Sequence, residues 1–397
     1  MNQPLIDKLR PAAQAPAPGF ALWNLGFRPF YLLASVFSAI SVLLWAAQFS
    51  GWLNSAYLRG PLWHGHEMLF GFALAVVAGF LLTAVRNWTA QPTVEGAPLA
   101  ALAGLWVAGR VLVLTPFGVA AALVNAAFPL ALAVAIGIPL WRSRNARNYF
   151  FIGLLVLMAA LVAGLHLALL GQGALPPRLG LVLGLDVMLF IMAVMAGRVV
   201  PMFTNNGVPG ANAERHPLVE KLALGSVLLL FVVDALQAPA GFIGALALVA
   251  AAAHGTRLAL WRGWRTIGTP LVWILHAAYA WIVIHLLLRG AAGLGWLAGT
   301  FDTHALTVGA IGGLTIGMMT RTARGHTGRP LRADGWETAM FVLVQLAAIA
   351  RVFGGMVPGL YMAGIQSSAL LWSAAFGLYA VRYWPMLSRS RMDGKSG

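Results

Sequence analysis

Residues 63–85 of the chain, WHGHEMLFGFALAVVAGFLLTAV, decide its fold class. From Met68 onward this stretch is an almost unbroken apolar run, and about 20 such residues in a helix cross the hydrocarbon core of a bilayer. Its first residues, however, include His64, His66 and Glu67, and lipid would penalise each of these side chains. The stretch therefore predicts a membrane helix that begins at a metal site.

The composition of the whole chain indicates the same class. Of the 397 residues, 60% are hydrophobic and 9% are charged, and the mean hydropathy is +0.81. Soluble globular domains are far more polar. We therefore expect an all-α polytopic membrane protein with about 12 transmembrane helices. Apolar runs of roughly 17 to 25 residues predict these helices at 28–50, 63–85, 98–115, 118–141, 148–171, 178–201, 217–237, 239–260, 270–289, 303–320, 335–355 and 358–384.

The helices are expected to form a single transmembrane domain at 28–384. An N-terminal lead at 1–27, rich in Ala and Pro, is expected to be disordered and cytoplasmic, with no cleavable signal. Residues 385–397 are expected to form a cytoplasmic tail. Some boundaries stay open, because three prolines could mark kinks as easily as turns: Pro116, Pro129 and Pro239.

The positions of the cations predict the orientation of the helices. Most cations lie in the connections on one side, which the positive-inside rule assigns to the cytoplasm. Both termini are then cytoplasmic, in the inner membrane of a bacterium. The net charge of +15 reflects this topology and contact with anionic lipids, and not nucleic-acid binding. The inner side carries Lys8, Arg10, Arg28, Arg142, Arg144, Arg147, Arg257, Arg262, Arg265, Arg321, Arg324, Arg329 and Arg332, and the outer side only Arg59, Arg110, Arg178, Arg289 and Arg351.

The second, sixth and tenth predicted spans end in similar short motifs. Each places an arginine at the membrane boundary with a threonine close by: Arg86, Arg198 and Arg321. This recurrence every four helices predicts three four-helix units in a pseudo-threefold arrangement. The three arginines could bind haem propionates or another anion, or they could anchor the helix ends at lipid headgroups.

Histidines at the outer ends of the spans are the candidate metal ligands. The chain has no cysteine, so a metal must be held by His, Met, Asp or Glu. His64, His66 and His304 lie at the outer ends of the second and tenth spans, and His166 and His285 approach the same level. Ionisable side chains within a membrane are usually functional. The group predicts a metal or haem site, although each histidine could instead cap a helix or bond a neighbour.

Helical geometry restricts how these side chains combine. At 100° per residue, His64 and His66 point about 200° apart and cannot both bind one metal from a regular helix. We therefore expect either two centres or an unwound first turn. Glu67 shares a helix face with His64, so it could bind a metal beside His64, orient it, or relay protons.

A second group of candidates lies toward the cytoplasmic side. His254 ends the eighth span and His276 lies about two turns into the ninth, so antiparallel packing would bring them to a similar depth. Tyr279 follows His276 by one turn and could donate a hydrogen bond or a proton. The group predicts either further metal ligands or histidines bonded to carbonyl groups across a helix pair.

Two further sets of side chains are expected to be structural. The sixth span carries Met188, Met192 and Met195 at helical spacing. Thioethers bind cuprous copper, but methionine more often fills a helix interface, so we expect these residues in the core. His326 is expected to organise a loop and His216 to be solvated.

The chain resembles the NnrS family, whose members are membrane proteins linked to nitric-oxide metabolism and resistance and described as containing haem and copper. The resemblance covers nearly the whole chain. The chain departs from the family pattern at Arg86, where the pattern has proline, and at His285, which lies outside the pattern. It is carried by Gly26 to Phe30, Trp63 to Met68 with Gly79 to Thr89, Gly197 to Thr204, Trp261 to Thr266, His304 to Gly312, Met319 to Arg321 and Gly325 to Pro330.

The resemblance implies cofactors and an activity. A haem, of b type, would be held by one or more of His64, His66 and His304, beside a copper ion on remaining histidines. Such a site would bind nitric oxide and detoxify it, either by scavenging alone or by reduction to nitrous oxide with Glu67 delivering protons. Electrons would come from a donor such as a quinol or a cytochrome. A more distant architectural likeness is to the catalytic subunit of haem–copper oxidases, in which a His-x-His pair serves two centres.

Two other functions are compatible with the same residues. In a copper-handling permease, the imidazoles would bind the ion transiently along a path between repeats. In a haem-based sensor or assembly protein, nitric oxide would bind without turnover.

Overall fold

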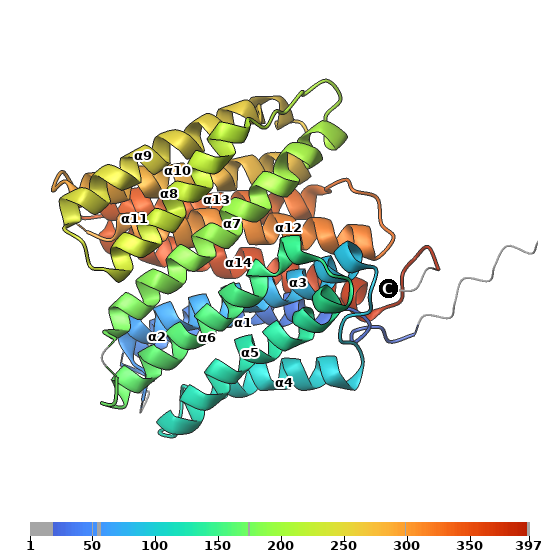
Figure 1. Cartoon of the computed structure of the whole chain (residues 1–397), viewed down its shortest axis with the longest axis horizontal. Coiled ribbons are helices and arrows are strands. Elements are labelled where there is room, and N and C mark those ends of the chain that lie inside the picture. Colours follow the sequence, from blue (N-terminus) through green and yellow to red (C-terminus); the bar gives the residue numbers. More distant parts are fainter. Residues whose placement is uncertain (1–18, 50, 54–56, 174, 298, 395–397) are drawn as a thin grey trace, which may run out of the picture.

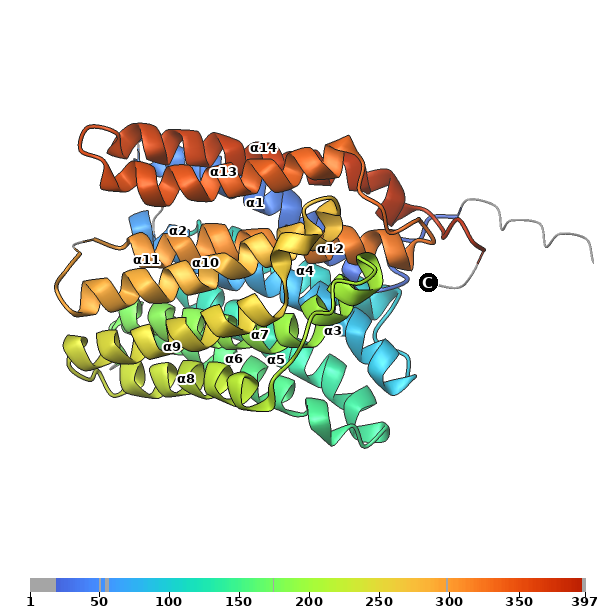
Figure 2. The ribbon, with the colours of Figure 1, turned by 90° about the horizontal axis from the view of Figure 1, so that it is seen from above.

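The described chain is almost entirely helical. The computed structural model describes residues 19–49, 51–53, 57–173, 175–297 and 299–394. Within these ranges the only β pairing is an isolated bridge between Phe20 and Arg389. The helices run back and forth along one common direction, as Figures 1 and 2 show from two sides.

Twelve helical rods make up the described bundle. Two of the rods are composite, with a π-helical segment inside them. The first joins α2 (Gly60–His66), η2 (Glu67–Ala73) and α3 (Leu74–Thr89), and the second joins α11 (Phe301–His304), η5 (Ala305–Ile311) and α12 (Gly312–His326). The remaining rods are α1 (Phe27–Phe49), α4 (Ala97–Leu112), α5 (Gly118–Arg142), α6 (Phe150–Leu169), α7 (Pro177–Gly207), α8 (Pro217–Ala235), α9 (Ala240–Leu260), α10 (Pro270–Gly293), α13 (Gly335–Met356) and α14 (Tyr361–Ser388).

The rods have the length and composition of membrane helices. Eight of the described helices are long and apolar enough to cross a bilayer, and α4 is a shorter apolar helix. Each predicted span overlaps one rod, so the expected polytopic membrane protein is confirmed at this level. The largest differences are at the ends of α7 and α12, which continue past the predicted residues 201 and 320 to Gly207 and His326.

The three prolines whose role the sequence leaves open occupy two kinds of position. Pro129 lies inside α5, whereas Pro116 and Pro239 lie in connections between helices. The last rod, α14, includes Pro385 and ends at Ser388, four residues beyond the predicted end of the span at 384. Of the expected lead, residues 1–18 lie outside the described residues, as do residues 395–397 of the tail.

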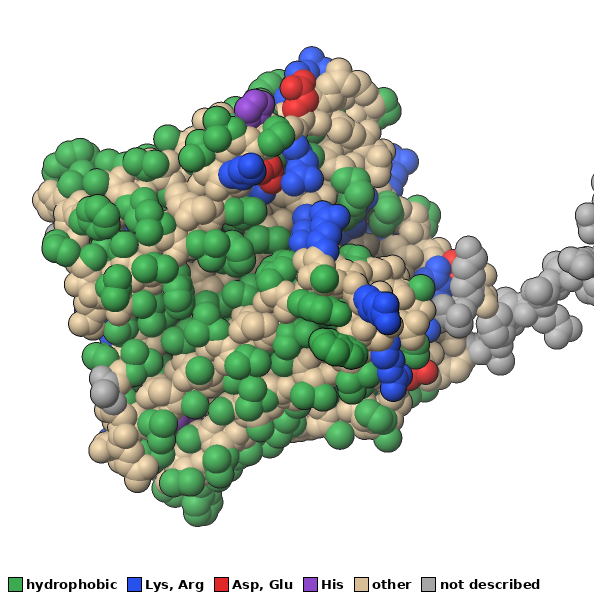
Figure 3. Space-filling view, in the orientation of Figure 1, with side chains coloured by type: hydrophobic (Ala, Val, Ile, Leu, Met, Phe, Trp, Pro, Cys, Tyr) green, Lys and Arg blue, Asp and Glu red, His purple; other side chains and the backbone are tan. Residues whose placement is uncertain are grey.

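The two ends of the described chain meet at one end of the bundle. The first rod, α1, packs along the last rod, α14, and the backbone N–H of Ala21 donates to the carbonyl of Ser388 over 2.8 Å. Lysine and arginine side chains gather toward this end, while hydrophobic side chains cover much of the remaining face (Figure 3). This distribution is the one expected of a protein whose sides face lipid.

The α2–η2–α3 rod lies at the centre of the bundle, since 89% of its most apolar window is buried. It also shares an unusual feature with the α11–η5–α12 rod. Each contains seven π-helical residues that begin directly after a histidine, His66 or His304. Aligned on these segments, the two rods match Arg86 with Arg324, and not with Arg321 as the sequence predicts. The sixth rod, α7, is assigned as α-helix throughout, so it does not share the feature.

We predict that close packing at Gly309 is essential for stability. A methyl group at this position in η5 would overlap the indole of Trp281 on α10. Gly309→Ala should therefore lower the free energy of unfolding by about 1–3 kcal/mol, measured by denaturant unfolding in detergent. The matched control is Gly377→Ala on α14, where no atom lies within 4 Å of the added methyl group. Equal stability of the two variants would contradict the close approach of α10 and η5.

Candidate metal centre

His66 and Glu67 form the centre of a buried polar network. Both side chains are 0% exposed. His66 Nδ1 lies 2.8 Å from Glu67 Oε1, and Arg110 Nη1 donates to the same oxygen over 2.5 Å. Arg110, which comes from α4, also donates to Asn125 Oδ1 of α5. The guanidinium group thus compensates the charge of the buried carboxylate, which would otherwise be costly in a low dielectric.

A second imidazole, from His166 of α6, completes the network. His66 Nε2 and His166 Nε2 lie 3.1 Å apart, and both rings are fully buried. His166 Nδ1 lies 2.9 Å from the hydroxyl group of Tyr57. The network therefore runs from Tyr57 through His166 and His66 to Glu67, and it draws on four rods and the segment before α2.

The hydrogen-bond partners of the two imidazole rings determine which ring nitrogens carry a hydrogen and which carry a lone pair. Because His66 Nδ1 donates to the Glu67 carboxylate, the neutral ring carries a lone pair on Nε2. When the Tyr57 hydroxyl donates to His166 Nδ1, the Nε2–H of His166 donates to that lone pair and the chain of hydrogen bonds can move a proton. When His166 Nδ1 donates to Tyr57 instead, both Nε2 lone pairs are directed at the same region and can bind one cation.

The second arrangement fits a copper ion. Nitrogen ligands bind such metals at roughly 2.0–2.1 Å, and two neighbouring ligands on one ion then lie about 3 Å apart, as the two Nε2 atoms do. Glu67 behind His66 forms the carboxylate–histidine pair that commonly orients a metal ligand. No group of three or more His, Cys, Asp or Glu that could hold a metal occurs within the described ranges. The two imidazoles of His66 and His166 are therefore the candidate ligands at this position.

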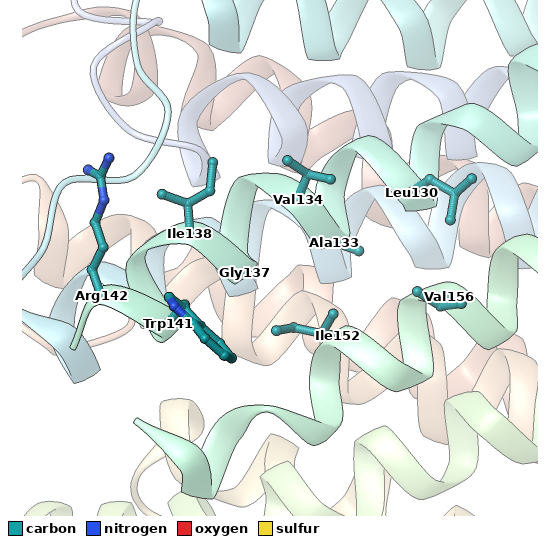
Figure 4. A pocket seen from close by; sticks show the side chains of 9 residues that line it. All are labelled: Leu130, Ala133, Val134, Gly137, Ile138, Trp141, Arg142, Ile152 and Val156. Carbon is teal, nitrogen blue, oxygen red and sulfur yellow. The ribbon is translucent and has the colours of Figure 1, made fainter. Parts of the chain in front are cut away.

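A haem does not fit the same histidines. A porphyrin cannot be placed between two ring nitrogens that are 3.1 Å apart. Two pockets, of about 450 and 400 Å³, are lined by residues other than His64, His66 and His304. The larger is an apolar groove between α5 and α6 on the outside of the bundle, seen in Figure 4 with Trp141 and Arg142 at one end.

His64 lies apart from this network. Its ring stacks on Trp45 of α1, with ring centroids 5.3 Å apart, and its buried Nδ1 has no described partner. His304 is only partly buried, and its Nδ1 lies 3.2 Å from the carbonyl oxygen of Thr300. His64 and His304 lie close enough to interact electrostatically with each other and with Arg351. The predicted separation of His64 from His66 is thus confirmed, with His66 facing α4 and α6 and His64 facing α1.

The Glu67 carboxylate serves His66 and not His64. It bonds to His66 and Arg110, and no hydrogen bond joins it to His64 among the described residues. The backbone from His64 to Glu67 is α-helical, with Glu67 at φ -70° and ψ -34°. The bonds to the His66 ring and the Arg110 guanidinium group therefore set the direction of the carboxylate.

The inner group of candidates separates into two contacts. His254 is saturated, because its Nδ1 accepts from the Tyr279 hydroxyl over 2.6 Å and its Nε2 donates to the carbonyl of Ala223 over 3.0 Å. This is the structural alternative that the sequence allows. His276 instead bonds Thr204 Oγ1 over 2.8 Å and lines the pocket of about 400 Å³. Tyr279 therefore serves His254, and not the adjacent His276.

The remaining candidates occupy separate places. Arg86 pairs with Glu95 over 3.1 Å, Arg198 donates to Asn148 over 2.7 Å, and Arg321 lies 3.7 Å above the ring of Phe203. The three arginines therefore share no anion site. Met188 is fully buried, and Met192 and Met195 pack against the same core, which agrees with the structural interpretation.

Four residues of the inner and outer networks are not among the predicted site residues. Tyr57 and Asn125 are ordinary polar residues and give no signal. Arg110 does give one, because it is an arginine within an apolar run at the level of Glu67. Glu220, which binds Arg257 over 2.9 and 2.6 Å, also stands at the start of a predicted span. A buried charge in one span is a reason to look for its counter-charge in another.

We predict that the Arg110–Glu67 pair is essential for folding. Arg110→Met leaves a buried carboxylate without its counter-charge and should cost about 3–5 kcal/mol of unfolding free energy. Combining it with Glu67→Gln should recover much of this loss, because no charge then remains. Arg86→Met is the control, since its pair with Glu95 is exposed and should be worth about 0–1 kcal/mol. Chemical unfolding in detergent gives the comparison, and equal losses in the two single variants would refute it.

The chain matches a known protein family over nearly its whole length. The model of that family, described as NnrS protein, matches residues 21–391. The matched region begins before α1 and ends after α14, so it includes every rod described above. No curated protein matches the chain.

Proposed function

The chain belongs to the NnrS family, and from this membership we propose that it binds nitric oxide at a copper centre near the outer face of a bacterial inner membrane and detoxifies it. NnrS proteins are membrane proteins generally linked to the nitric oxide response. The observation that supports a copper centre is the facing pair of buried imidazoles, His66 and His166, with their Nε2 atoms 3.1 Å apart.

The protein side chains suit a reaction that consumes protons. Reduction of two nitric oxide molecules to nitrous oxide and water takes up two electrons and two protons. A bound copper ion would supply a coordination position for nitric oxide and exchange single electrons with a donor such as a quinol or a cytochrome. Glu67 Oε2 is buried without a described partner, so this carboxyl group can hold a proton beside His66. Tyr279 has no part in this centre, because it is bonded to His254 and Arg257.

A haem is the second cofactor that the family resemblance implies. A porphyrin does not fit between His66 and His166, because their Nε2 atoms lie 3.1 Å apart. His276 is the candidate histidine that does line a pocket. An absorption spectrum of the purified protein, with its Soret region, tests for haem independently of the copper centre.

The proposed orientation has all twelve rods crossing the membrane and both termini in the cytoplasm. It is supported by the gathering of lysine and arginine side chains at the end where the described chain begins and ends (Figure 3). The His66–His166 pair then lies toward the opposite, outer face, because α2 begins and α6 ends there.

A copper-handling permease is the second candidate function. It is favoured by the absence, within the described residues, of a third His, Cys, Asp or Glu at the pair, since stable sites usually have more ligands. The two candidate functions predict different measurements. A permease should move copper across vesicle membranes, whereas a nitric oxide centre should show a spectrum that nitric oxide changes.

We predict that copper binding requires both imidazoles. The detergent-purified protein should bind copper, and His66→Ala or His166→Ala should weaken binding at least tenfold, because each removes a ligand. Glu67→Gln should weaken it by about 10–100-fold, because it removes the group that orients His66. Copper titration followed by electron paramagnetic resonance, with and without nitric oxide, measures both the affinity and the response.

His304→Ala is the matched control. His304 is partly exposed and bonds only a backbone carbonyl, so its loss should leave copper binding unchanged. Wild-type affinity in the His66 and His166 variants would remove the pair from the function. Copper binding that nitric oxide leaves unchanged would favour the permease.

A further inference from the structure

A second buried charge cluster lies away from the histidine pair. It joins Asp186 of α7, Asp234 of α8 and Arg289 of α10. Arg289 Nη1 donates to Asp186 Oδ1 over 3.1 Å, and Arg289 Nη2 donates to Asp234 Oδ2. The side chains of the three residues are 3%, 8% and 13% exposed, respectively. Three rods are thus held together by charged groups that water scarcely reaches.

The charges of this cluster do not balance. One guanidinium group faces two carboxyl groups, so two ionised carboxylates would leave a net negative charge within an apolar bundle. Such a charge is expensive to bury. By contrast, the Glu67–Arg110 pair is balanced one to one.

The surrounding titratable groups do not supply the missing positive charge. His285, one turn before Arg289 on α10, lies near Asp234 and donates from Nδ1 to the carbonyl of Asp302 over 2.9 Å. A second proton, on its buried Nε2, would find no acceptor among the described residues, so this ring stays neutral. His254 of α9 has both ring nitrogens engaged. Asp302 of α11 would add negative charge, and Arg178 of α7 is exposed and lies near Asp302. The imbalance therefore has to be resolved within the cluster.

One oxygen of the pair also lacks a hydrogen-bond donor. The single guanidinium group of Arg289 holds Asp186 and Asp234 side by side, yet Asp186 Oδ2 is buried and finds no donor among the described residues. Two carboxylates cannot hydrogen-bond, because neither has a hydrogen to donate. A single proton on one of them would supply the donor and remove the excess charge. Paired carboxyl groups elsewhere share a proton for the same reason.

We propose that Asp186 and Asp234 hold one proton between them at neutral pH and form a proton-binding site on α7 and α8. The proton belongs to the pair, and neither residue owns it alone. Arg289 holds the two groups together and neutralises the carboxylate that remains. The site needs neither copper nor nitric oxide, so it does not rest on the proposed function.

Infrared spectroscopy of the full-length protein in detergent or lipid tests this proposal. A protonated carboxyl group has a carbonyl stretch that a carboxylate lacks. The wild-type spectrum at neutral pH should contain such a band, and titration to alkaline pH should remove it. Asp186→Asn and Asp234→Asn should each abolish this component, because the single remaining carboxylate pairs with Arg289 and ionises.

Asp302→Asn is the matched control, since Asp302 is a neighbouring acidic group outside the pair. It should leave the component of the Asp186–Asp234 pair intact. A wild-type spectrum without a carboxylic acid band at neutral pH would overturn the proposal even if every variant failed to fold. The proposal would also fail if the band persisted in both folded asparagine variants, or if it disappeared only in Asp302→Asn.

Discussion

The ion pair between Glu67 and Arg110 is the interaction on which the histidine centre depends. Glu67 uses one oxygen for both Arg110 and His66. The position of the carboxylate therefore determines which nitrogen of His66 carries the hydrogen, and it directs the lone pair of Nε2 toward His166. Asn125 holds the guanidinium group from α5. A single charge pair thus orients an imidazole and connects the rods around it.

Buried arginines hold the bundle together at several places, of which three join the rods around the histidines. Arg110 joins α4 to η2, Arg257 joins α9 to α8 through Glu220, and Arg289 joins α10 to α7 and α8. Arg257 also donates to Tyr279, which in turn donates to His254. In a lipid environment a polar group cannot rely on water for partners. Each network therefore restricts which rods can be neighbours, in addition to what apolar packing provides.

The bounds of the rods were largely predictable, because the length of an apolar run and the thickness of a bilayer are both local constraints. The partners of the polar residues were not. His66 pairs with His166 of α6, and not with His304, and nothing local in the sequence specifies this choice. The partners of Glu67 were not specified either, because the bonds to His66 and Arg110, and not the helix face shared with His64, set the direction of its carboxylate. The counter-charge for Glu67 had a detectable signal, since Arg110 interrupts an apolar run.

The pairing of Phe20 with Arg389 makes the chain nearly circular. A short linker could join these two positions, and the chain could then be reopened in the exposed connection between α7 and α8, residues 208–216. Six rods precede that connection and six follow it. A circular permutant of this kind would therefore begin with α8 and end with α7 while every rod kept its original direction in the bundle.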